Sequence, residues 1–340
     1  MNILLIKLGA LGDVLRTTPL LEGLRKKYPS SHITWLVDEP HRGVLENNPS
    51  IDRLFASSQD PDLWARTDYD LVINLDKEPE ALDAFMRAKG RHKMGFGRDR
   101  AGALCAANPE SDYALRLGLD DELKFRINQK TYQEISFEQV GLAFQGEDYC
   151  FLPDPSNLEK ARLFLAGLLP KGSIAPIGLN TGAGTRFAGK RLPAESYREL
   201  GERLYRQLKR PVLLLGGQDE LERNAWIEKT ASVPLIHTGS HPIAFFAGLV
   251  SACDLVVAGD TTAMHIAIAM KVPVLTYFAS TCAAEIELYG RGDKIVSTIS
   301  CAPCYKKICP IDEKCMKEMD LDVFLERAEK LLKRHAIRIP

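Results

Sequence analysis

Two glycine-rich turns, each directly after a short apolar run, constrain the fold of this chain more than any other feature. The first reads Lys7-Leu-Gly-Ala-Leu-Gly-Asp13, and the second runs from Thr181 to Lys190 with glycines at 182, 184 and 189. Glycine lets a turn adopt positive φ and lets a ligand approach the backbone. The helix after such a turn presents unpaired N–H groups to an anion. The two turns therefore predict two open α/β sheets that face each other across a cleft, one holding a nucleotide diphosphate and the other the group to be modified.

Size and charge limit the class of protein. A chain of 340 residues exceeds a typical single core, so two domains are expected. The net charge of −1 argues against a nucleic-acid partner. No apolar run reaches the roughly 18 residues of a membrane span, and no basic segment precedes the first apolar run as in a secretory signal. We therefore expect a cytoplasmic protein in which most of the eight cysteines are reduced.

Strand and helix signals alternate in the first part of the chain. Strands are predicted at 3–7, 32–37 and 71–75, and helices at 13–27 and 131–144. The segment 90–102 is rich in Arg, Lys and Gly and is predicted to be a loop. Prolines at 153, 155 and 170 then punctuate the chain, and we place the domain boundary there, with residues 1–155 in one domain and 156–320 in the other.

The second part repeats the alternation. Strands are predicted at 174–180, 212–215, 255–258 and 272–278, and helices at 157–168, 193–208, 220–229 and from about 261. Alternating β and α elements imply parallel sheets with right-handed crossovers. Residues 321–336 read as a charged amphipathic helix whose apolar face must pack on a domain.

Asp13 follows Gly12 at the first strand-to-helix junction. Asp is common as a helix cap, which is one interpretation. The other is a general base at the carboxyl edge of the sheet, where open α/β folds bind ligands. A carboxylate at a helix N-terminus is a weak base, but it can take a proton that leaves as the hydroxyl oxygen attacks.

The segment from Gly184 to Lys190 nearly matches a P-loop. A P-loop requires Ser or Thr after the lysine to hold magnesium, and Arg191 stands there instead, so we reject an NTPase. What remains is a turn with Thr185, Arg186 and Lys190 near a helix N-terminus, suited to a diphosphate. A solvated basic turn is the alternative.

Two further turns follow buried strands. Gly217 and its acidic neighbours fit a ribose contact or a helix cap. The run Asp260-Thr261-Thr262-Ala-Met-His265 fits a sugar contact beside an anion-binding helix start, or again a cap. A histidine one turn inside a helix is more often structural than catalytic.

Four cysteines gather near the C-terminus, namely Cys301, Cys304, Cys309 and Cys315. Four cysteines within fifteen residues fit a tetrathiolate metal site, two disulfides or free thiols, and a cytosolic location favours metal or free thiols. Their spacing matches no standard zinc ribbon. A structural zinc or iron is therefore one hypothesis for this cluster.

The segment 87–100 is locally very basic and includes Arg91, Lys93 and Arg98. It reads either as a solvated loop or as a contact for a phosphorylated acceptor at a membrane face.

Together these motifs resemble the ADP-heptose:lipopolysaccharide heptosyltransferases of glycosyltransferase family nine, over nearly the whole chain. The segments that carry the resemblance are 6–19, 180–193 and 259–265, with a cysteine cluster at 301–316 seen in part of the family. The resemblance implies a GT-B fold of two Rossmann-like domains, the C-terminal one binding donor and the N-terminal one acceptor. It further implies that the final helix, 321–336, packs back on the first domain.

The resemblance also implies the chemistry: inverting transfer of heptose from ADP-heptose to the inner core of a lipid A–Kdo precursor, with no cofactor required for catalysis and a peripheral contact with the inner membrane. Asp13 aligns with the proposed base and Gly12 adjoins it on the acceptor side. The donor positions are Thr185, Arg186, Lys190, Gly217, Glu222, Asp260, Thr261, Thr262 and His265. Arg186 stands where some members have Thr. Two alternatives stay open: a GT-B transferase for another sugar nucleotide, and a metal-binding or redox protein with a degenerate nucleotide site.

Overall fold

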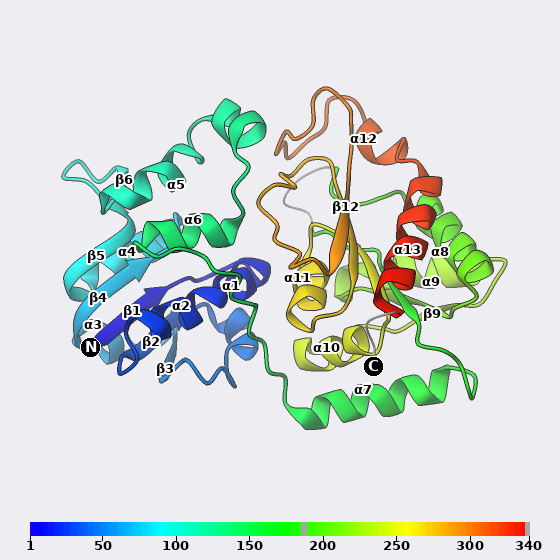
Figure 1. Ribbon diagram of the computed structural model, residues 1–340, viewed down its shortest axis with the longest axis horizontal. Coiled ribbons are helices and arrows are strands. Elements are labelled where there is room, and N and C mark those ends of the chain that lie inside the picture. The colour runs from blue at the N-terminus through cyan, green and yellow to red at the C-terminus, as the bar shows by residue number, and fades with distance from the viewer. Residues whose placement is uncertain (185–188, 337–340) are drawn as a thin grey trace. The chain divides into compact units, whose positions relative to one another are not determined.

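The computed structural model describes residues 1–184 and 189–336, which form two compact units. Unit 1 comprises Met1–Leu152 together with Ala284–Glu287, and unit 2 comprises Pro153–Ala283 together with the chain from Leu288. Each unit is a sheet covered by helices, as Figure 1 shows. Residues 153–155, assigned to the first domain from the sequence, belong to unit 2.

The sheet of unit 1 has the strand order β3-β2-β1-β4-β5-β6. Its strands are β1 (Asn2–Ile6), β2 (His32–Val37), β3 (Arg53–Ala56), β4 (Asp68–Asn74), β5 (Lys89–Arg98) and β6 (Leu104–Ala106). Neighbours are parallel except β5 and β6. The chain runs from β1 outward through β2 to β3 and then returns to the other side of β1 as β4. The carboxyl ends of β1 and β4 therefore flank a topological switch point, where open sheets bind ligands.

The helices of unit 1 are shorter than the sequence predicts. They are α1 (Leu11–Thr17), α2 (Pro19–Lys27), α3 (Asp62–Ala65), α4 (Pro79–Arg87), α5 (Asp112–Arg116) and α6 (Tyr132–Gln139), with 3₁₀ turns η1 (Glu39–Val44) and η2 (Pro109–Ser111) and a π-helical turn η3 (Leu123–Ile127). The expected helix 13–27 is two helices because Pro19 has no N–H to continue the first. The expected helix 131–144 ends at Gln139, ahead of Gly141 with φ +65°.

The basic segment 90–102 is mostly a strand, not the predicted loop. It forms most of β5, which pairs with β4 on one side and with β6 on the other. The glycines at 90, 95 and 97 serve close contacts instead. A side chain at Gly95, where φ is +98°, would collide with the carbonyl of Asn74. The charged residues at the start of this strand stay exposed, so the strand tolerates them.

The sheet of unit 2 has the order β12-β11-β10-β7-β8-β9 and is parallel throughout. Its strands are β7 (Ile177–Asn180), β8 (Val212–Leu215), β9 (Leu235–His237), β10 (Leu255–Gly259), β11 (Val274–Phe278) and β12 (Gly292–Val296). Here the order reverses between β7 and β10. The second glycine-rich turn follows β7 and Asp260 follows β10, so both lie at the switch point of unit 2.

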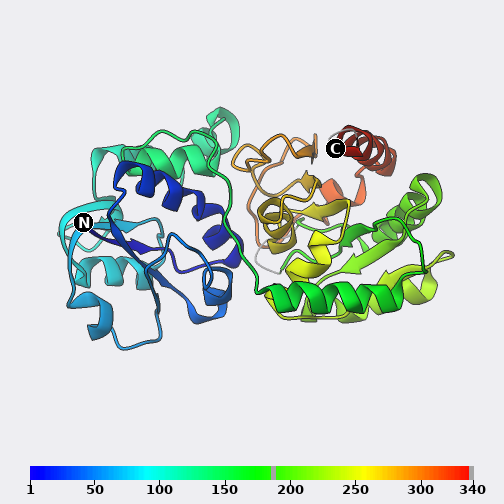
Figure 2. The same ribbon diagram turned by 60° about the horizontal axis from the view of Figure 1, so that its bottom comes forward.

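The helices of unit 2 are α7 (Pro155–Leu168), α8 (Ala194–Leu208), α9 (Leu221–Thr230), α10 (Ile243–Ser251), α11 (Thr262–Ala269), α12 (Lys314–Lys317) and α13 (Leu321–Ala336), with a 3₁₀ turn η4 (Gln218–Glu220). Helices α7 and α10 lie side by side (Figures 1 and 2). Gly248 permits this approach, because a Cβ there would lie 2.6 Å from the side chain of Ala161. Within the described ranges, no helix is long and apolar enough to cross a membrane.

The expectation that residues 321–336 return to the first domain is wrong, because α13 packs in unit 2. It lies beside α8 and the strands β10, β11 and β12 (Figure 1). Phe324, Leu325, Ala328 and Leu331 form its buried stripe, which completes the core of that unit. The physical reason is the short link from α12 to α13, which keeps the helix beside the sheet of unit 2, where its apolar stripe is buried.

This packing predicts the effect of a substitution in α13. Phe324 is fully buried and lies against Tyr277, with ring centroids 5.5 Å apart. Phe324→Ala should lower the free energy of unfolding by about 3–5 kcal/mol, because a large cavity replaces the ring. Urea unfolding followed by circular dichroism measures this. Glu329→Ala on the exposed face is the control, and equal, small losses for both variants would contradict this packing.

Candidate active site

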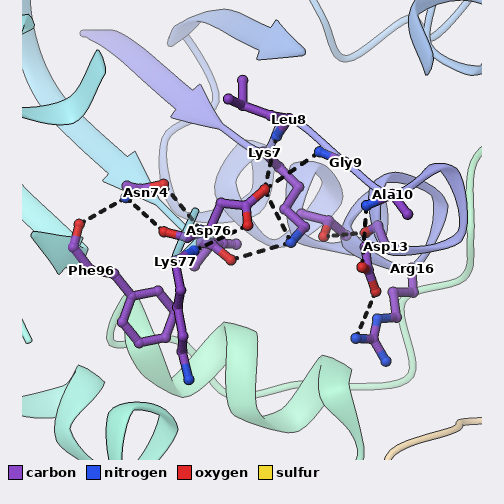
Figure 3. A network of polar contacts seen from close by, with 12 residues as sticks. Lys7, Leu8, Gly9, Ala10, Asp13, Arg16, Asn74, Asp76, Lys77 and Phe96 are labelled. Atoms are coloured by element: carbon purple, nitrogen blue, oxygen red, sulfur yellow. Dashed lines mark hydrogen bonds and ion pairs between the residues drawn. The ribbon is translucent and has the colours of Figure 1, made fainter. Parts of the chain in front are cut away.

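A buried ion pair supports the turn after β1 at the switch point of unit 1. Lys7 Nζ lies 3.4 Å from Asp76 Oδ2, and the two side chains are only 7% and 9% exposed. The same carboxylate oxygen accepts hydrogen bonds from the N–H groups of Leu8 (3.2 Å) and Gly9 (3.4 Å), as Figure 3 shows. One carboxylate thus fixes the backbone that leads to Asp13.

Neighbouring charges determine the ionisation of Lys7. Burial opposes its positive charge, but Tyr132, Asp13 and Asp76 favour that charge and raise the pKa of this lysine above its ordinary value. The lysine is therefore an ammonium at neutral pH. Sequence reasoning missed Asp76, although an acidic residue directly after a buried strand is the signal that identifies it.

Asp13 lies in the first turn of α1, directly after the buried Gly12. Its Oδ2 accepts a hydrogen bond from the N–H of Ala10 (3.3 Å), and its Oδ1 lies 2.7 Å from Nη2 of Arg16. The side chain is 31% exposed. Asp13 is therefore not the N-cap residue of α1, which is Ala10, but its carboxylate does accept the N–H of that residue. Its role as a base stays a prediction.

Arg16 is held on several sides. Its guanidinium carbon lies 4.0 Å from the centroid of the Tyr132 ring, and its Nη1 lies 3.9 Å from Oε2 of Glu285. Glu285 belongs to the short segment that joins unit 1, although it stands between β11 and β12 in the sequence. Burial disfavours the cation, but Asp13, Tyr132 and Glu285 raise the pKa of Arg16 above its ordinary value. Sequence reasoning missed both Arg16 and Glu285.

The structure does not bring the predicted acceptor cations Arg91 and Lys93 to Asp13. Arg91 pairs with Asp70 (3.5 Å), level with the start of β1 and thus at the amino edge of the sheet. Lys93 donates a hydrogen bond to the carbonyl of Phe85 (2.7 Å) at the end of α4. Arg91 therefore pairs with a carboxylate of the neighbouring strand, and Lys93 caps a carbonyl near the end of α4.

Arg98 differs from the other two cations in its position. It lies beyond the carboxyl end of β4, since Gly95 pairs with the last residue of that strand. Its Nε donates to Asp83 Oδ1 (3.1 Å) and its Nη1 to the carbonyl of Gly102 (3.1 Å). Both contacts leave it on the same edge of the sheet as Asp13.

The switch point of unit 2 brings together three predicted donor residues. Lys190 Nζ lies 3.6 Å from Asp260 Oδ2, and the two side chains are 17% and 21% exposed. Asn180, the last residue of β7, donates through Nδ2 to the carbonyl of Gly182 (2.9 Å) and to Oγ1 of Thr261 (3.4 Å). An ammonium, a carboxylate and a hydroxyl therefore meet at one edge of the sheet.

The start of α11 shapes this edge. Thr261 caps the helix by accepting a hydrogen bond from the N–H of Met264 (3.5 Å), and Thr262 is the first helical residue. His265 is buried one turn further on. Gly259 allows the close approach, because a Cβ there would lie 2.7 Å from the carbonyl oxygen of Lys190. Thr185 and Arg186, also predicted donor residues, lie outside the described residues.

A buried carboxylate also supports the turns after β7 and β8. Glu220 accepts a hydrogen bond from the N–H of Gly217 (2.9 Å) and packs against Gly182, where any Cβ would collide with it. The predicted ribose contact, Glu222, is exposed in the first turn of α9. Arg223, which sequence reasoning missed, donates to the carbonyl of Thr181 (2.9 Å).

The four cysteines lie in a segment that packs against Gly189, the residue before Lys190. The N–H of Cys304 donates to the carbonyl of Ser280 (3.1 Å), whose hydroxyl donates to the carbonyl of Gly189 (3.2 Å). The sulfur of Cys315 lies 3.1 Å from the position of a Cβ on that glycine. Burial, together with the charges of the other three thiols, raises the pKa of Cys315 to about 11.

The metal hypothesis gains no support from this geometry. None of the eight cysteines forms a disulfide. Across the described part of the chain, no three His, Cys, Asp or Glu side chains are arranged to hold a metal ion. The zinc or iron site at Cys301, Cys304, Cys309 and Cys315 stays a prediction.

Comparison with known proteins identifies relatives along the whole chain. Residues 176–315 match the model of glycosyltransferase family 9 (heptosyltransferase). Lipopolysaccharide heptosyltransferase 1 of Pseudomonas aeruginosa is 27% identical over 333 residues, which cover 91% of this chain and 87% of that protein. The matched region of the family model contains the whole edge built from Asn180, Lys190 and Asp260.

Solved structures match the fold. A family 9 glycosyl transferase from Veillonella parvula superposes with a TM-score of 0.76 at 22% identity, covering 98% of this chain and 97% of that chain. The ADP-heptose LPS heptosyltransferase II of Escherichia coli gives a TM-score of 0.71 at 18% identity, covering 99% and 100%. The predicted GT-B fold of two Rossmann-like domains is thereby confirmed.

The Lys7–Asp76 pair generates a stability prediction. Asp76→Ala removes the partner of a buried ammonium and the acceptor of two backbone N–H groups. The free energy of unfolding should fall by about 3–5 kcal/mol, as when one partner of a buried ion pair is lost. Urea denaturation measures it. Asp62→Ala, which breaks an exposed pair with Arg66 in the same unit, should have little effect. An Asp76 variant as stable as the Asp62 control would contradict the role of this carboxylate.

Proposed function

We propose that this chain transfers a heptose from ADP-heptose to the inner core of a lipopolysaccharide precursor, because residues 176–315 match the glycosyltransferase family 9 model and a lipopolysaccharide heptosyltransferase 1 is 27% identical over 91% of the chain. The observation that carries the proposal is the pair of switch points. One carries Asp13, and the other carries Lys190 beside Asp260. A base in one unit and a cation in the other suit a transfer reaction: the base activates the acceptor hydroxyl, and the cation stabilises the departing diphosphate.

Unit 2 is the proposed donor site. The ammonium of Lys190 contacts the diphosphate, and Asp260 accepts hydrogen bonds from the sugar hydroxyls. The Thr262 end of α11 adds backbone N–H groups near the phosphates. Glu222, exposed in the first turn of α9, is the candidate for the ribose hydroxyls. Thr185 and Arg186 complete the proposed diphosphate turn.

In the proposed reaction, the acceptor hydroxyl oxygen attacks the anomeric carbon as the bond from that carbon to the ADP oxygen breaks. The proton of the hydroxyl passes to the carboxylate of Asp13, and ADP leaves with the electron pair. Attack on the face opposite the leaving group inverts the anomeric configuration. Lys190 and the fixed N–H groups of α11 stabilise the negative charge that grows on ADP.

The proposed acceptor is a phosphorylated glycolipid, and the names of the relatives give lipopolysaccharide for those proteins. It is expected on the acceptor side of unit 1, near Gly12 and Asp13. Arg98, on the same edge of the sheet, is the remaining candidate cation for it. Such an acceptor implies a cytoplasmic enzyme that meets the inner face of the membrane without spanning it.

The role of Asp13 predicts a specific loss. Asp13→Asn keeps a side-chain oxygen that can accept the hydrogen bond from the N–H of Ala10, so the start of α1 should stay folded. It should lower turnover by roughly 10²–10⁴-fold through loss of the base. Affinity for ADP, measured by calorimetry, should not change. Asp154→Asn, at the capping Asp of α7, is the matched control and should keep full turnover. Near-normal turnover of the Asp13 variant would remove it from the mechanism.

The role of Lys190 predicts a loss of ADP affinity. Lys190→Met removes a charge-assisted contact to the diphosphate, so ADP should bind about 10-fold or more weakly. Lys229→Met, which removes an exposed charge at the end of α9, should bind ADP as the wild type does. Calorimetric titration of both variants decides the assignment, and equal ADP affinities would refute it.

A further inference from the structure

Arg16 forms an ion pair with Asp13, and the proposed reaction gives this arginine no role. Arg16, one turn along α1, places Nη2 2.7 Å from Oδ1 of Asp13. Isolated pairs of this kind on a helix surface contribute little, because both side chains must be ordered to form them. Here the arginine is only 17% exposed and is already ordered by other contacts, so forming the ion pair costs little additional side-chain entropy.

Helix α6 supplies most of this fixation. The guanidinium stacks on the ring of Tyr132 at 4.0 Å, and the hydroxyl of that tyrosine is 2.8 Å from Oγ1 of Thr17. Gln133 Nε2 donates to the backbone carbonyl of Arg16 (3.1 Å). The N–H of Tyr132 also donates to the carbonyl of Glu285 (2.9 Å), whose carboxylate faces the arginine. The guanidinium is therefore oriented whether or not a substrate is present.

We propose that Arg16 is a positioning residue that holds the carboxylate of Asp13 ionised and turned toward the acceptor hydroxyl. The proposal rests on the proposed function, in which Asp13 is the base. One carboxylate oxygen is held by the N–H of Ala10 and the other by the guanidinium, so rotation of the group about its last bond is restricted (Figure 3). Orientation of a reacting group in advance lowers the barrier of the step in which it acts.

The charge of Arg16 has a second consequence. A nearby cation favours the ionised form of a carboxylate and disfavours its protonation. Asp13 is thus kept as the anion down to lower pH, and it accepts the proton only when bond formation makes the hydroxyl strongly acidic. Removal of the cation should make the carboxylate protonate more readily, so activity should begin to fall at a higher pH as the solution is acidified.

Other titratable groups face this pair, and the experiment must separate them. They are Lys7 on β1, His41 in η1, Tyr132 on α6, Tyr149 and Glu285. Burial raises the pKa of Tyr149, so this residue stays neutral, and Lys7 stays charged. Burial lowers the pKa of His41, so this histidine titrates in the acid range and needs its own control.

The test is the dependence of kcat on pH. Arg16→Met should lower kcat by about 10–100-fold and move the acid limb by about one pH unit to higher pH, because an opposite charge near a carboxylate shifts its titration by one unit or more. Arg16→Lys keeps the positive charge but loses the two-pronged geometry of the guanidinium. Its kcat should fall in part, while the acid limb of its pH profile should stay where it is in the wild type. ADP affinity should be unchanged in both. An Arg16→Met enzyme with the wild-type acid limb would overturn the proposal.

Two controls exclude other causes. Arg25→Met breaks a pair of similar length and exposure in the same unit, with Arg25 Nη2 2.7 Å from Asp52 Oδ2 and side chains 24% and 33% exposed. It should leave the acid limb in place, as should His41→Gln. A shift of the limb in either control would assign the effect to general destabilisation or to the histidine, and would overturn the proposal.

Combination with the Asp13 variant separates this proposal from the proposed function. If Arg16 acts through Asp13, the double variant Asp13→Asn/Arg16→Met should be no slower than Asp13→Asn alone. Multiplicative losses would mean an independent role and would overturn the proposal while the base remains. Full activity of Asp13→Asn alone would instead overturn the base assignment, and the role of Arg16 would fall with it.

Discussion

Each unit has a buried carboxylate beside a glycine turn. The backbone of the turns at the carboxyl edge of each sheet, and so the position of the proposed site residues there, depends on this carboxylate. In unit 1, Asp76 holds the N–H groups of Leu8 and Gly9 and neutralises Lys7. In unit 2, Glu220 holds the N–H of Gly217 and packs against Gly182. Each carboxylate follows a strand next to the one that carries the glycine turn. A buried acceptor of this kind satisfies backbone donors that a tight turn would otherwise leave unpaired.

Fixed polar groups of this kind suit the proposed chemistry. Stabilisation of a leaving diphosphate depends on donors that are in place before the reaction begins. Lys190 meets this requirement because Gly259 lets its backbone lie against β10 and because Ser280 and Cys315 pack on the residue before it. The carboxylate of Asp13, the proposed base, is likewise held in place by Ala10 and Arg16. The cysteine segment therefore contributes to the shape of the donor edge whether or not its thiols ever hold a metal.

Local patterns in the sequence predicted the parts of this fold that depend on local chemistry. Buried apolar runs marked β1, β7 and β10, and Asp13, Lys190 and Asp260 lie in the turns or helix starts that follow these strands. Partners from elsewhere in the chain were missed. Asp76 and Glu285 act on residues far away in sequence, and nothing beside them indicates which turn or guanidinium they contact.

Two errors have the same origin. The charge of segment 90–102 suggested a loop, but pairing of β5 with β4 and β6 decided its structure. The apolar stripe of residues 321–336 predicted a buried face correctly but could not tell which sheet would cover it, and the resemblance pointed to the wrong one. Long-range packing settles such questions, and a single sequence records it only weakly.

The central claim is that two nucleotide-fold units supply opposite charges to the two ends of one breaking bond. A crystal structure of the complex with a non-reactive ADP-heptose analogue and an acceptor fragment tests this most directly. The account predicts an Asp13 carboxylate oxygen within about 2.6–3.2 Å of the attacking hydroxyl and the ammonium of Lys190 on a diphosphate oxygen. A complex in which Asp13 faces away from the acceptor, or in which Lys190 touches no phosphate, would contradict it.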